Sequence, residues 1–235
     1  MVGKRSYGDP CGTARALDVI GERWALLVVR ELLLGPKRFT DLSRGLPAMS
    51  QNVLAARLRE LESSGVLRNY RLGPPASTRV YELTERGYAL EAVLIALGRW
   101  GSRIPLDAVD AAAELSVDAL VLALKTTFDA GRAGDLDTRI ELRLEGDRFL
   151  ATISGGTLRI GRVESGRVES AGGAATGMTA AADAVMETDP ATLRSVVFGG
   201  RALADALRAG VVLLTGEQDA ATRFTGCFPR PEPVV

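Results

Sequence analysis

Residues 35 to 67 constrain the fold of this chain more than any other stretch. A turn at Gly35-Pro36 leads into a short helix over residues 40–45, and a second turn follows at Leu46-Pro47. A longer helix then runs from Ser50 to Gly65. Glycine and proline interrupt regular structure, so their positions separate two helices by a tight turn. The segment therefore predicts a helix-turn-helix arrangement.

The longer of these helices has sharp ends and two distinct faces. Ser50 suits an N-cap because its hydroxyl can accept a hydrogen bond from a free N–H of the first turn, and Gly65 can adopt the left-handed conformation that ends a helix. Leucines at three- and four-residue spacing predict a buried stripe, made of Leu54, Leu58 and Leu61. The opposite face carries small and polar residues, namely Asn52, Ala55, Ala56, Arg59 and Ser63. Such a face suits a helix that enters the major groove of double-stranded DNA.

Two alternating segments follow this helix. Residues 67–72 and 78–83 alternate apolar and polar side chains across the loop Gly73-Pro74-Pro75-Ala76-Ser77, which predicts a β-hairpin. We interpret it as the wing of a winged helix.

The DNA contacts expected in this half come from the longer helix, the turn before the short helix and the flanks of the wing. They are Lys37, Arg38, Ser50, Gln51, Asn52, Ala55, Arg59, Arg71 and Arg79. Lys37 and Arg38 could instead be ordinary surface residues, and Arg57, nearer the leucine stripe, could form an internal salt bridge.

The charge is unevenly distributed along the chain. The whole chain has 29 basic and 29 acidic residues, but residues 1–105 carry 16 basic and 10 acidic residues, and the remainder 13 and 19. The first half therefore carries a formal charge of +6 and the second a formal charge of −6. A basic half suits a polyanion and an acidic half is repelled by one. We expect two domains, 1–105 and 115–235, joined by an alanine-rich linker at 106–114.

A helix beginning after Thr84 and reaching about Arg103 carries more apolar surface than one small domain needs. We expect part of this surface to form a homodimer interface through Leu90, Val93, Leu94, Leu97 and Trp100. An earlier helix of this half, expected over residues 22–34, should pack into the core through Trp24.

The second half predicts an α+β domain. After a helical stretch over 115–131, residues 139–145 and 148–154 alternate with period two across a turn at Gly146-Asp147, and 157–163 and 167–170 suggest further strands. Residues 180–187, 189–197, 203–208 and 217–228 read as helices, and 211–215 as a fully apolar strand. Strands followed by helices favour one sheet with helices over one face.

Composition argues against several classes of protein. The sequence has no histidine and two cysteines, Cys11 and Cys227, far apart in sequence, so zinc sites and histidine general bases are excluded and no cofactor is expected. No glycine pattern fits a phosphate-binding loop. The hydroxyls of Thr157, Thr179 and Ser195 lack a histidine to activate them as nucleophiles, so we expect that the protein is not an enzyme. No apolar run is long enough to cross a membrane and no signal sequence is recognisable, which suggests the cytoplasm.

The first hundred residues resemble the HxlR-type winged helix-turn-helix transcription regulators of bacteria, which are related to the MarR group. The resemblance rests on Cys11, residues 16–21, Trp24, residues 30–32, residues 35–39, Leu46-Pro47, Ser50, residues 53–54, residues 57–61, residues 79–84 and Gly87. We expect a homodimeric transcription regulator on a pseudo-palindromic operator, as for other dimeric helix-turn-helix proteins. The wing tip departs from the pattern because it carries no positive charge, which leaves phosphate contact to Arg71 and Arg79.

The resemblance also makes Cys11 a candidate redox sensor, since some members of that family sense oxidants or electrophiles through a cysteine near the N-terminus. Lys4, Arg5 and Arg15 lie near it in sequence, and positive charge favours a thiolate. Cysteine is also among the most readily buried residues, so a packing role is the alternative.

The second half resembles the lipid-binding domain of sterol carrier protein type 2, through residues 204–207, 210–217 and Phe224. That resemblance implies a small apolar effector in a tunnel between helices and sheet. Its candidate lining is Phe128, Leu142, Phe149, Ile153, Met178, Val197, Phe198 and Phe224, although ordinary core is the favoured interpretation of each residue taken singly. A lipid or apolar-ligand carrier without a regulatory role is the second alternative for the whole chain.

Overall fold

The computed structural model describes residues 6–73, 78–105, 114–164, 167–169, 181–230 and 232–233. The chain divides into two compact units, Met1–Leu94 and Ile95–Val235. The predicted linker at 106–114 lies outside the described residues except for Glu114. No described helix combines the length and the apolar character needed to cross a bilayer.

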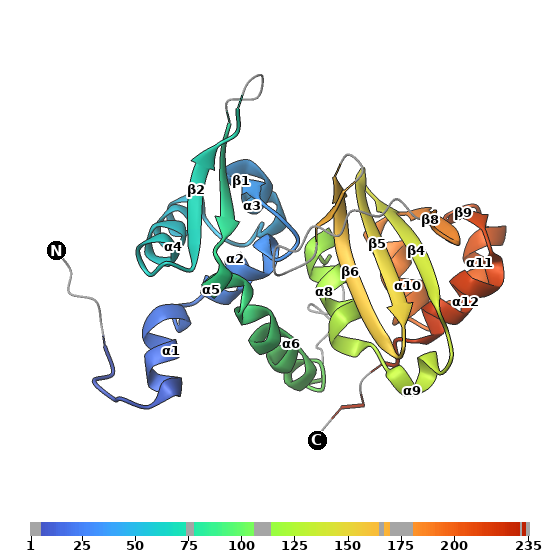
Figure 1. Ribbon diagram of the computed structural model, residues 1–235, viewed down its shortest axis with the longest axis horizontal. Coiled ribbons are helices and arrows are strands. Elements are labelled where there is room, and N and C mark those ends of the chain that lie inside the picture. Colours follow the sequence, from blue (N-terminus) through green and yellow to red (C-terminus); the bar gives the residue numbers. More distant parts are fainter. Residues whose placement is uncertain are drawn as a thin grey trace. The chain divides into compact units, whose positions relative to one another are not determined.

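The first unit is mainly helical with a small sheet (Figure 1). Its elements in order are α1 (Gly12–Ile20), α2 (Ala25–Leu32), β1 (Lys37–Arg38), α3 (Phe39–Gly45), α4 (Gln51–Ser63), β2 (Leu67–Arg71), β3 (Arg79–Leu83), α5 (Glu85–Tyr88) and the start of α6 (Leu90–Gly101). The three strands form an antiparallel sheet in the order β1-β3-β2. The predicted winged helix-turn-helix is therefore present, and β1 is an addition that the sequence pattern did not reveal.

The core of this unit is built on leucines. Those with less than 2% exposure include Leu32, Leu42, Leu54, Leu58, Leu61 and Leu83. The α4 stripe at residues 54, 58 and 61 is thus buried as its spacing predicts. Gly65 has φ 71° and ends the helix in the left-handed region, again as predicted.

Two predicted helices have different ends in the structure. The helix expected from Glu22 begins at Ala25 because Trp24 has φ 79°, which no α-helix accommodates. The single helix expected from Thr84 to Arg103 is two helices, α5 and α6, separated at Ala89. α5 is held close to β2, because the Thr84 hydroxyl donates to the Gly65 and Val66 carbonyls at 2.7 and 3.1 Å.

The second unit is an α+β layer with a mixed sheet. It contains α8 (Val117–Thr127), α9 (Ala130–Ala133), β4 (Thr138–Leu144), β5 (Asp147–Ser154), β6 (Thr157–Glu164), β7 (Arg167–Glu169), β8 (Ala184–Thr188), α10 (Pro190–Val197), α11 (Leu203–Arg208), β9 (Leu213–Gly216) and α12 (Gln218–Gly226). The strand order is β7-β6-β5-β4-β8-β9, and β4 and β8 run parallel while the other pairs are antiparallel.

One face of this sheet forms the core of the second unit. Every second residue of β4 from Thr138 to Leu144 is buried, and so are Phe149, Ala151 and Ile153 of β5. Helix α8 contacts β6, α12 contacts β4 and β8, and α10 contacts both of these helices. The alternating pattern read from the sequence therefore corresponds to a half-buried sheet.

Three predictions for the second unit are wrong in detail. Helix α8 stops at Thr127, because Phe128 is extended with ψ 130°, and Asp129 caps a separate short helix, α9. The first hairpin turns at Glu145-Gly146 instead of Gly146-Asp147, with φ of 51° and 89° at those residues. The strand expected at 211–215 is present as β9 but runs from Leu213 to Gly216, at the edge of the sheet, with Leu213 61% exposed.

The fourth difference is the largest. Residues 180–187 were expected to be helical, but 184–188 form β8, beside β4 in the interior of the sheet. Alanine and methionine favour helices in isolation, whereas here Ala184 and Met186 alternate with outward residues and are buried. Backbone pairing with β4 and burial of alternate side chains outweigh the local preference.

Candidate nucleic-acid interface

Helix α4 presents a polar face away from the leucine stripe. The Ser50 hydroxyl accepts a hydrogen bond from the Val53 N–H at 3.4 Å, so it caps the helix as predicted. Gln51, Asn52 and Arg59 are exposed, whereas Ala55 is half-buried. The Arg59 Nε donates to the Ala55 carbonyl at 3.1 Å, which holds the side chain along its own helix. The structure thus places four predicted contact residues, 50, 51, 52 and 59, at the N-terminal and exposed parts of one helix.

Arg57 is separate from this face. Its guanidinium lies 2.5 Å from Glu60 and 3.4 Å from Glu22, and only 15% of its side chain is exposed. Arg57 therefore forms the internal salt bridge that was the alternative to a DNA contact.

The wing supplies two more predicted contacts. Arg71 and Arg79 are opposite each other in the β2–β3 register, and both are exposed. The tip at residues 74–77 lies outside the described residues. Arg68, in the same hairpin, is bound to Glu82 at 2.6 Å, and this pair raises the pKa of Arg68 through a hydrogen bond and the carboxylate's charge. Arg71 and Arg79 are therefore the better candidates for a polyanion.

Lys37 does not match its predicted position on the surface. Its Nζ lies 3.0 Å from the Oε2 of Glu31, a fully buried carboxylate, and only 14% of the Lys37 side chain is exposed. The ammonium is thus engaged inside the unit, because a buried carboxylate needs positive partners. Arg38, next in the chain, is exposed and immediately precedes α3. Of this predicted pair, Arg38 is exposed and Lys37 is largely buried.

The sequence patterns above do not identify Glu31 as a functional residue. The signal that could have revealed it is a carboxylate in an otherwise apolar stretch, between Val28 and Leu34. A charged residue is almost never fully buried unless it is paired.

The residues predicted for a dimer interface fall into two groups. Val93, Leu97 and Trp100 are exposed, with Trp100 at 67%, and lie on one stripe of α6. Leu90 is half-buried, and Leu94 is buried within the chain itself. The end of α6 instead packs on α8: a Cβ at Gly98 would lie 3.0 Å from Thr126, and the Arg99 Nε donates to the Thr126 carbonyl at 3.2 Å.

Cys11 is exposed and caps α1. Its Sγ accepts a hydrogen bond from the Ala14 N–H at 3.3 Å, and its own N–H donates to Asp9 at 2.9 Å. Lys4 and Arg5, expected to lie near it, are outside the described residues, and Arg15 is exposed. Cys227 is different, since it is buried and desolvation raises its pKa.

Most of the residues predicted to line an apolar tunnel are buried in the core of the second unit. Leu142, Phe149, Ile153 and Phe224 have no exposed surface, Val197 is buried, and Phe128 and Phe198 are half-buried. Phe128 and Phe224 both contact Phe228, with ring centroids 6.1 and 5.0 Å apart. Met178 lies outside the described residues. Five of the eight residues are thus buried core residues of this unit, and two are half-buried.

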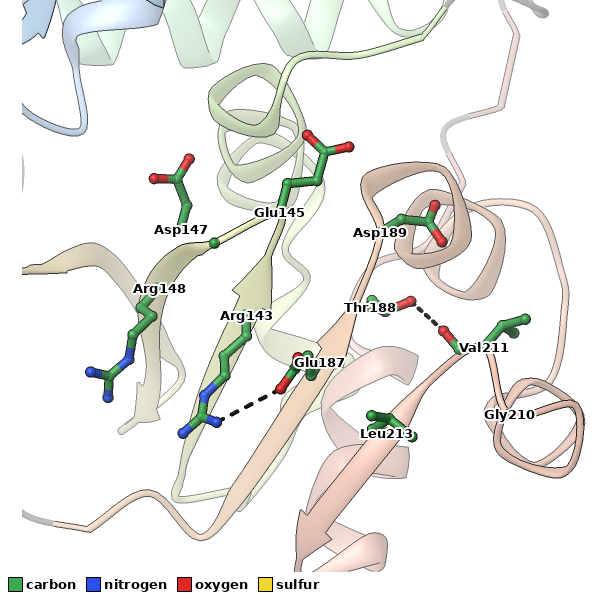
Figure 2. A pocket seen from close by; sticks show the side chains of 11 residues that line it. Arg143, Glu145, Asp147, Arg148, Glu187, Thr188, Asp189, Gly210, Val211 and Leu213 are labelled. Carbon is green, nitrogen blue, oxygen red and sulfur yellow. Dashed lines mark hydrogen bonds and ion pairs between the residues drawn. The ribbon is translucent and has the colours of Figure 1, made fainter.

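A cavity of about 750 Å³ lies elsewhere in this unit, and none of those eight residues lines it. Figure 2 shows charged side chains from the β4–β5 turn and from the end of β8 around it. Arg143 lies 3.7 Å from Glu187, and the Thr188 hydroxyl donates to the Val211 carbonyl at 2.7 Å. Six of its eleven lining residues are charged, which is not the lining expected for an apolar ligand.

Residues 19–107 match the family described as HxlR-like helix-turn-helix. The HTH-type transcriptional regulator YodB of Bacillus subtilis is 36% identical over 88 residues, which cover 37% of this chain and 79% of YodB. The uncharacterised HTH-type regulator YvaP of the same organism is 37% identical over 89 residues, which cover 37% of this chain and 82% of YvaP.

Solved structures similar to the chain cover the same portion. The reduced form of YodB from B. subtilis is 35% identical and covers 40% of this chain and 92% of its own, with a TM-score of 0.37. The redox regulator HypR in its oxidised form is 32% identical and covers 41% of this chain and 100% of its own, with a TM-score of 0.38. The extent and identity of the sequence matches show that this chain belongs, through its first unit, to the HxlR-like helix-turn-helix family of transcriptional regulators.

Proposed function

We propose that the chain is a homodimeric transcription regulator that binds a pseudo-palindromic operator through α4 and the β2–β3 hairpin. The observation that carries the proposal is the exposure of Asn52 and Arg59 on α4 together with the opposed arginines at the base of the wing. In dimeric helix-turn-helix proteins two such helices enter successive major grooves roughly 34 Å apart. The role needs no catalytic step.

The direct test is the salt dependence of duplex binding. Arg59→Ala should weaken binding to a duplex selected by the wild-type protein, and it should reduce the slope of log K against log[salt] by about 1 if Arg59 meets a phosphate. Arg208→Ala removes an exposed arginine from α11 and serves as the control. Equal affinity of Arg59→Ala and wild type at matched salt would contradict this assignment.

The second unit is proposed to hold a small apolar effector, in keeping with the resemblance to the sterol carrier domain. Support comes from the aromatic core that Phe128, Phe224 and Phe228 form beside the sheet. Since Phe224 and Phe228 are buried, an effector that contacts them would have to separate the helices from the sheet in order to enter. A ligand changes operator affinity only as far as it binds two states of the protein unequally.

A fluorescent long-chain fatty acid can probe this part of the proposal. We expect saturable binding by the full chain, reduced in Phe224→Ala, and a change in operator affinity when the probe is present. Probe binding without any salt-sensitive duplex binding would favour the alternative, a carrier without a regulatory role. Absence of probe binding would refute the effector proposal.

A thiol switch at Cys11 is the second candidate function. The observation favouring it is an exposed thiol at the N-cap of α1, since redox-active cysteines are accessible to solvent. The relative YodB has been solved in diamide-treated and quinone-bound forms. Cys11→Ser keeps a good N-cap, so the variant should bind the operator as wild type does and lose any response to diamide. A retained diamide response would exclude Cys11.

A further inference from the structure

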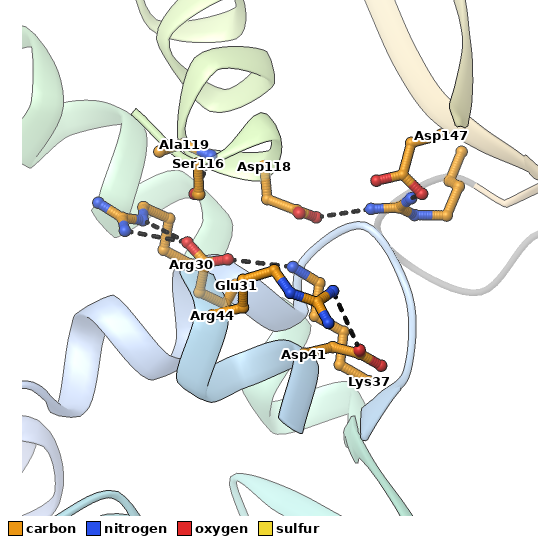
Figure 3. A network of polar contacts seen from close by, with 10 residues as sticks. Arg30, Glu31, Lys37, Asp41, Arg44, Ser116, Asp118, Ala119 and Asp147 are labelled. Atoms are coloured by element: carbon orange, nitrogen blue, oxygen red, sulfur yellow. Dashed lines mark hydrogen bonds and ion pairs between the residues drawn. The ribbon is translucent and has the colours of Figure 1, made fainter. Parts of the chain in front are cut away.

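The carboxylate of Glu31 is the meeting point of three elements of the first unit. Glu31 lies in α2 and has no exposed surface. Its Oε1 lies 2.9 Å from the Arg30 guanidinium and its Oε2 lies 3.0 Å from the Lys37 ammonium, which belongs to β1. Figure 3 shows Glu31 between these two cations, with the Arg44–Asp41 pair of α3 nearby.

The end of α3 closes over the same carboxylate. A Cβ built on Gly45 would lie 2.3 Å from the Glu31 Oε2 and 2.9 Å from its Cδ. Real Cβ atoms do not approach so closely, so glycine is the residue that lets α3 end against this side chain. Glu31 therefore fixes the separation of α2 and α3 from within.

The contacts continue from this carboxylate to both parts of the proposed DNA surface. Lys37 pairs with Tyr81 of β3, so its ion pair connects α2 to the wing sheet. Helix α2 also contacts α4 directly. A buried ion pair that loses one partner leaves an uncompensated charge, so these elements should shift together when the pair is broken.

We propose that Glu31 is a positioning residue for DNA binding: through Lys37 and Gly45 it sets the wing and α3 relative to α4. The proposal rests on the proposed function, since it assumes that this unit binds duplex DNA. Being fully buried, Glu31 touches no DNA itself. Replacing the Glu31 carboxylate should therefore change DNA binding only by changing the positions of the wing and α3.

A purely electrostatic effect and a positioning effect predict changes of opposite sign in the DNA affinity of Glu31→Gln. Removing a negative charge from a DNA-binding unit should strengthen binding to a polyanion. Loss of positioning should instead weaken it, by about tenfold at a salt concentration where both proteins are folded. Asp41→Asn is the matched control, because Asp41 is a partly exposed carboxylate on α3 that pairs with Arg44 at 3.6 Å. We expect it to bind as tightly as wild type or more tightly.

The experiment measures binding to a duplex selected by the wild-type protein, over roughly 50 to 200 mM salt, with thermal unfolding of each variant recorded alongside. If wild type shows no salt-sensitive binding, the proposed function fails before the variants are considered. If wild type binds and folded Glu31→Gln binds as tightly, the positioning role is overturned. A role in stability alone lowers the melting temperature without lowering the affinity of the folded protein.

Lys37→Met decides the question if Glu31→Gln does not fold. Arg30 still faces the carboxylate in this variant, so folding is better preserved. Positioning predicts weaker binding with an unchanged slope of log K against log[salt]. A slope smaller by about 1 means that Lys37 meets a phosphate directly, and unchanged affinity means that the pair has no bearing on DNA. Either result overturns the proposal.

Discussion

Arg71 and Arg79 lie directly opposite one another in the β2–β3 hairpin, at the last register pair before the wing tip. Both side chains are exposed. Like charges in directly opposite positions destabilise an antiparallel pair. Such a pair is consistent with a surface that meets a polyanion, which would relieve the repulsion.

We therefore expect Arg79→Thr to have opposite effects on stability and binding. The free energy of unfolding should rise by about 0.2–1 kcal/mol, because the repulsion is removed and threonine favours strands. Duplex affinity should fall, and the salt slope should decrease by about 1. Urea unfolding and a salt titration of binding measure the two effects, with Arg208→Thr as control. Tighter or unchanged duplex binding would remove the wing from the interface.

The exposed stripe of α6 leads to a prediction about assembly. Leu97→Glu and Trp100→Glu should each shift the protein from dimer to monomer, because an unpaired carboxylate in an apolar interface is costly. Sedimentation measures the oligomeric state. Leu213→Glu is the control, since Leu213 is at least as exposed as Leu97 but lies on the edge strand β9. If all three variants sediment as wild type does, α6 is not the interface.

Gly216 is expected to be intolerant of any side chain. Its φ is 91°, and a Cβ there would lie 2.2 Å from the Asp183 carbonyl oxygen. The Asp183 carboxylate in turn accepts from the Thr138 hydroxyl at 2.9 Å and the Arg139 N–H at 2.7 Å, so this region cannot move freely. Gly216→Ala should lower the unfolding free energy by about 2 kcal/mol or more.

The control for that variant is Gly210→Ala. Gly210 also has a positive φ, 68°, but a Cβ there meets nothing within 4 Å. Gly210→Ala should lower the unfolding free energy by only about 1 kcal/mol, which is the cost of placing alanine in a left-handed backbone conformation. Chemical denaturation compares the two. Equal losses would show that the contact with Asp183 is unimportant.

Acid should destabilise the second unit through Glu141. Hydrogen bonds, first from Arg148 and also from Arg143, lower the pKa of Glu141. Its side chain is only 13% exposed. A carboxyl group whose pKa is lowered by folding contributes stability above its unfolded pKa, and this contribution is lost as the pH falls through the folded value.

The corresponding variant is Glu141→Gln. Its unfolding free energy should be lower than that of wild type near neutral pH, and it should depend less on pH below the ordinary carboxyl pKa of about 4.3. Unfolding curves from pH 7 down to about 3 provide the measurement. Glu145→Gln, at an exposed turn position, should follow the wild-type curve. Parallel curves for wild type and Glu141→Gln would contradict the linkage.

Much of the first unit could be predicted from the sequence because its signals are local. Ser50, the leucine stripe and Gly65 specify α4 within one stretch of chain, through capping, periodicity and a left-handed terminus. The wing hairpin and the β4–β5 hairpin follow from period two. For the same reason the predicted contact residues of α4 lie together in the structure.

The remaining features depend on contacts between distant residues. The strand β8 is formed by a helix-favouring sequence because β4 pairs with it from more than forty residues away. Leu94 and Trp100 belong to one apolar pattern, yet packing buries the first and leaves the second exposed. Lys37 and Arg38 are adjacent and both basic. Only the tertiary structure separates them, because it places a buried carboxylate, Glu31, within reach of one ammonium and leaves the other cation to the solvent.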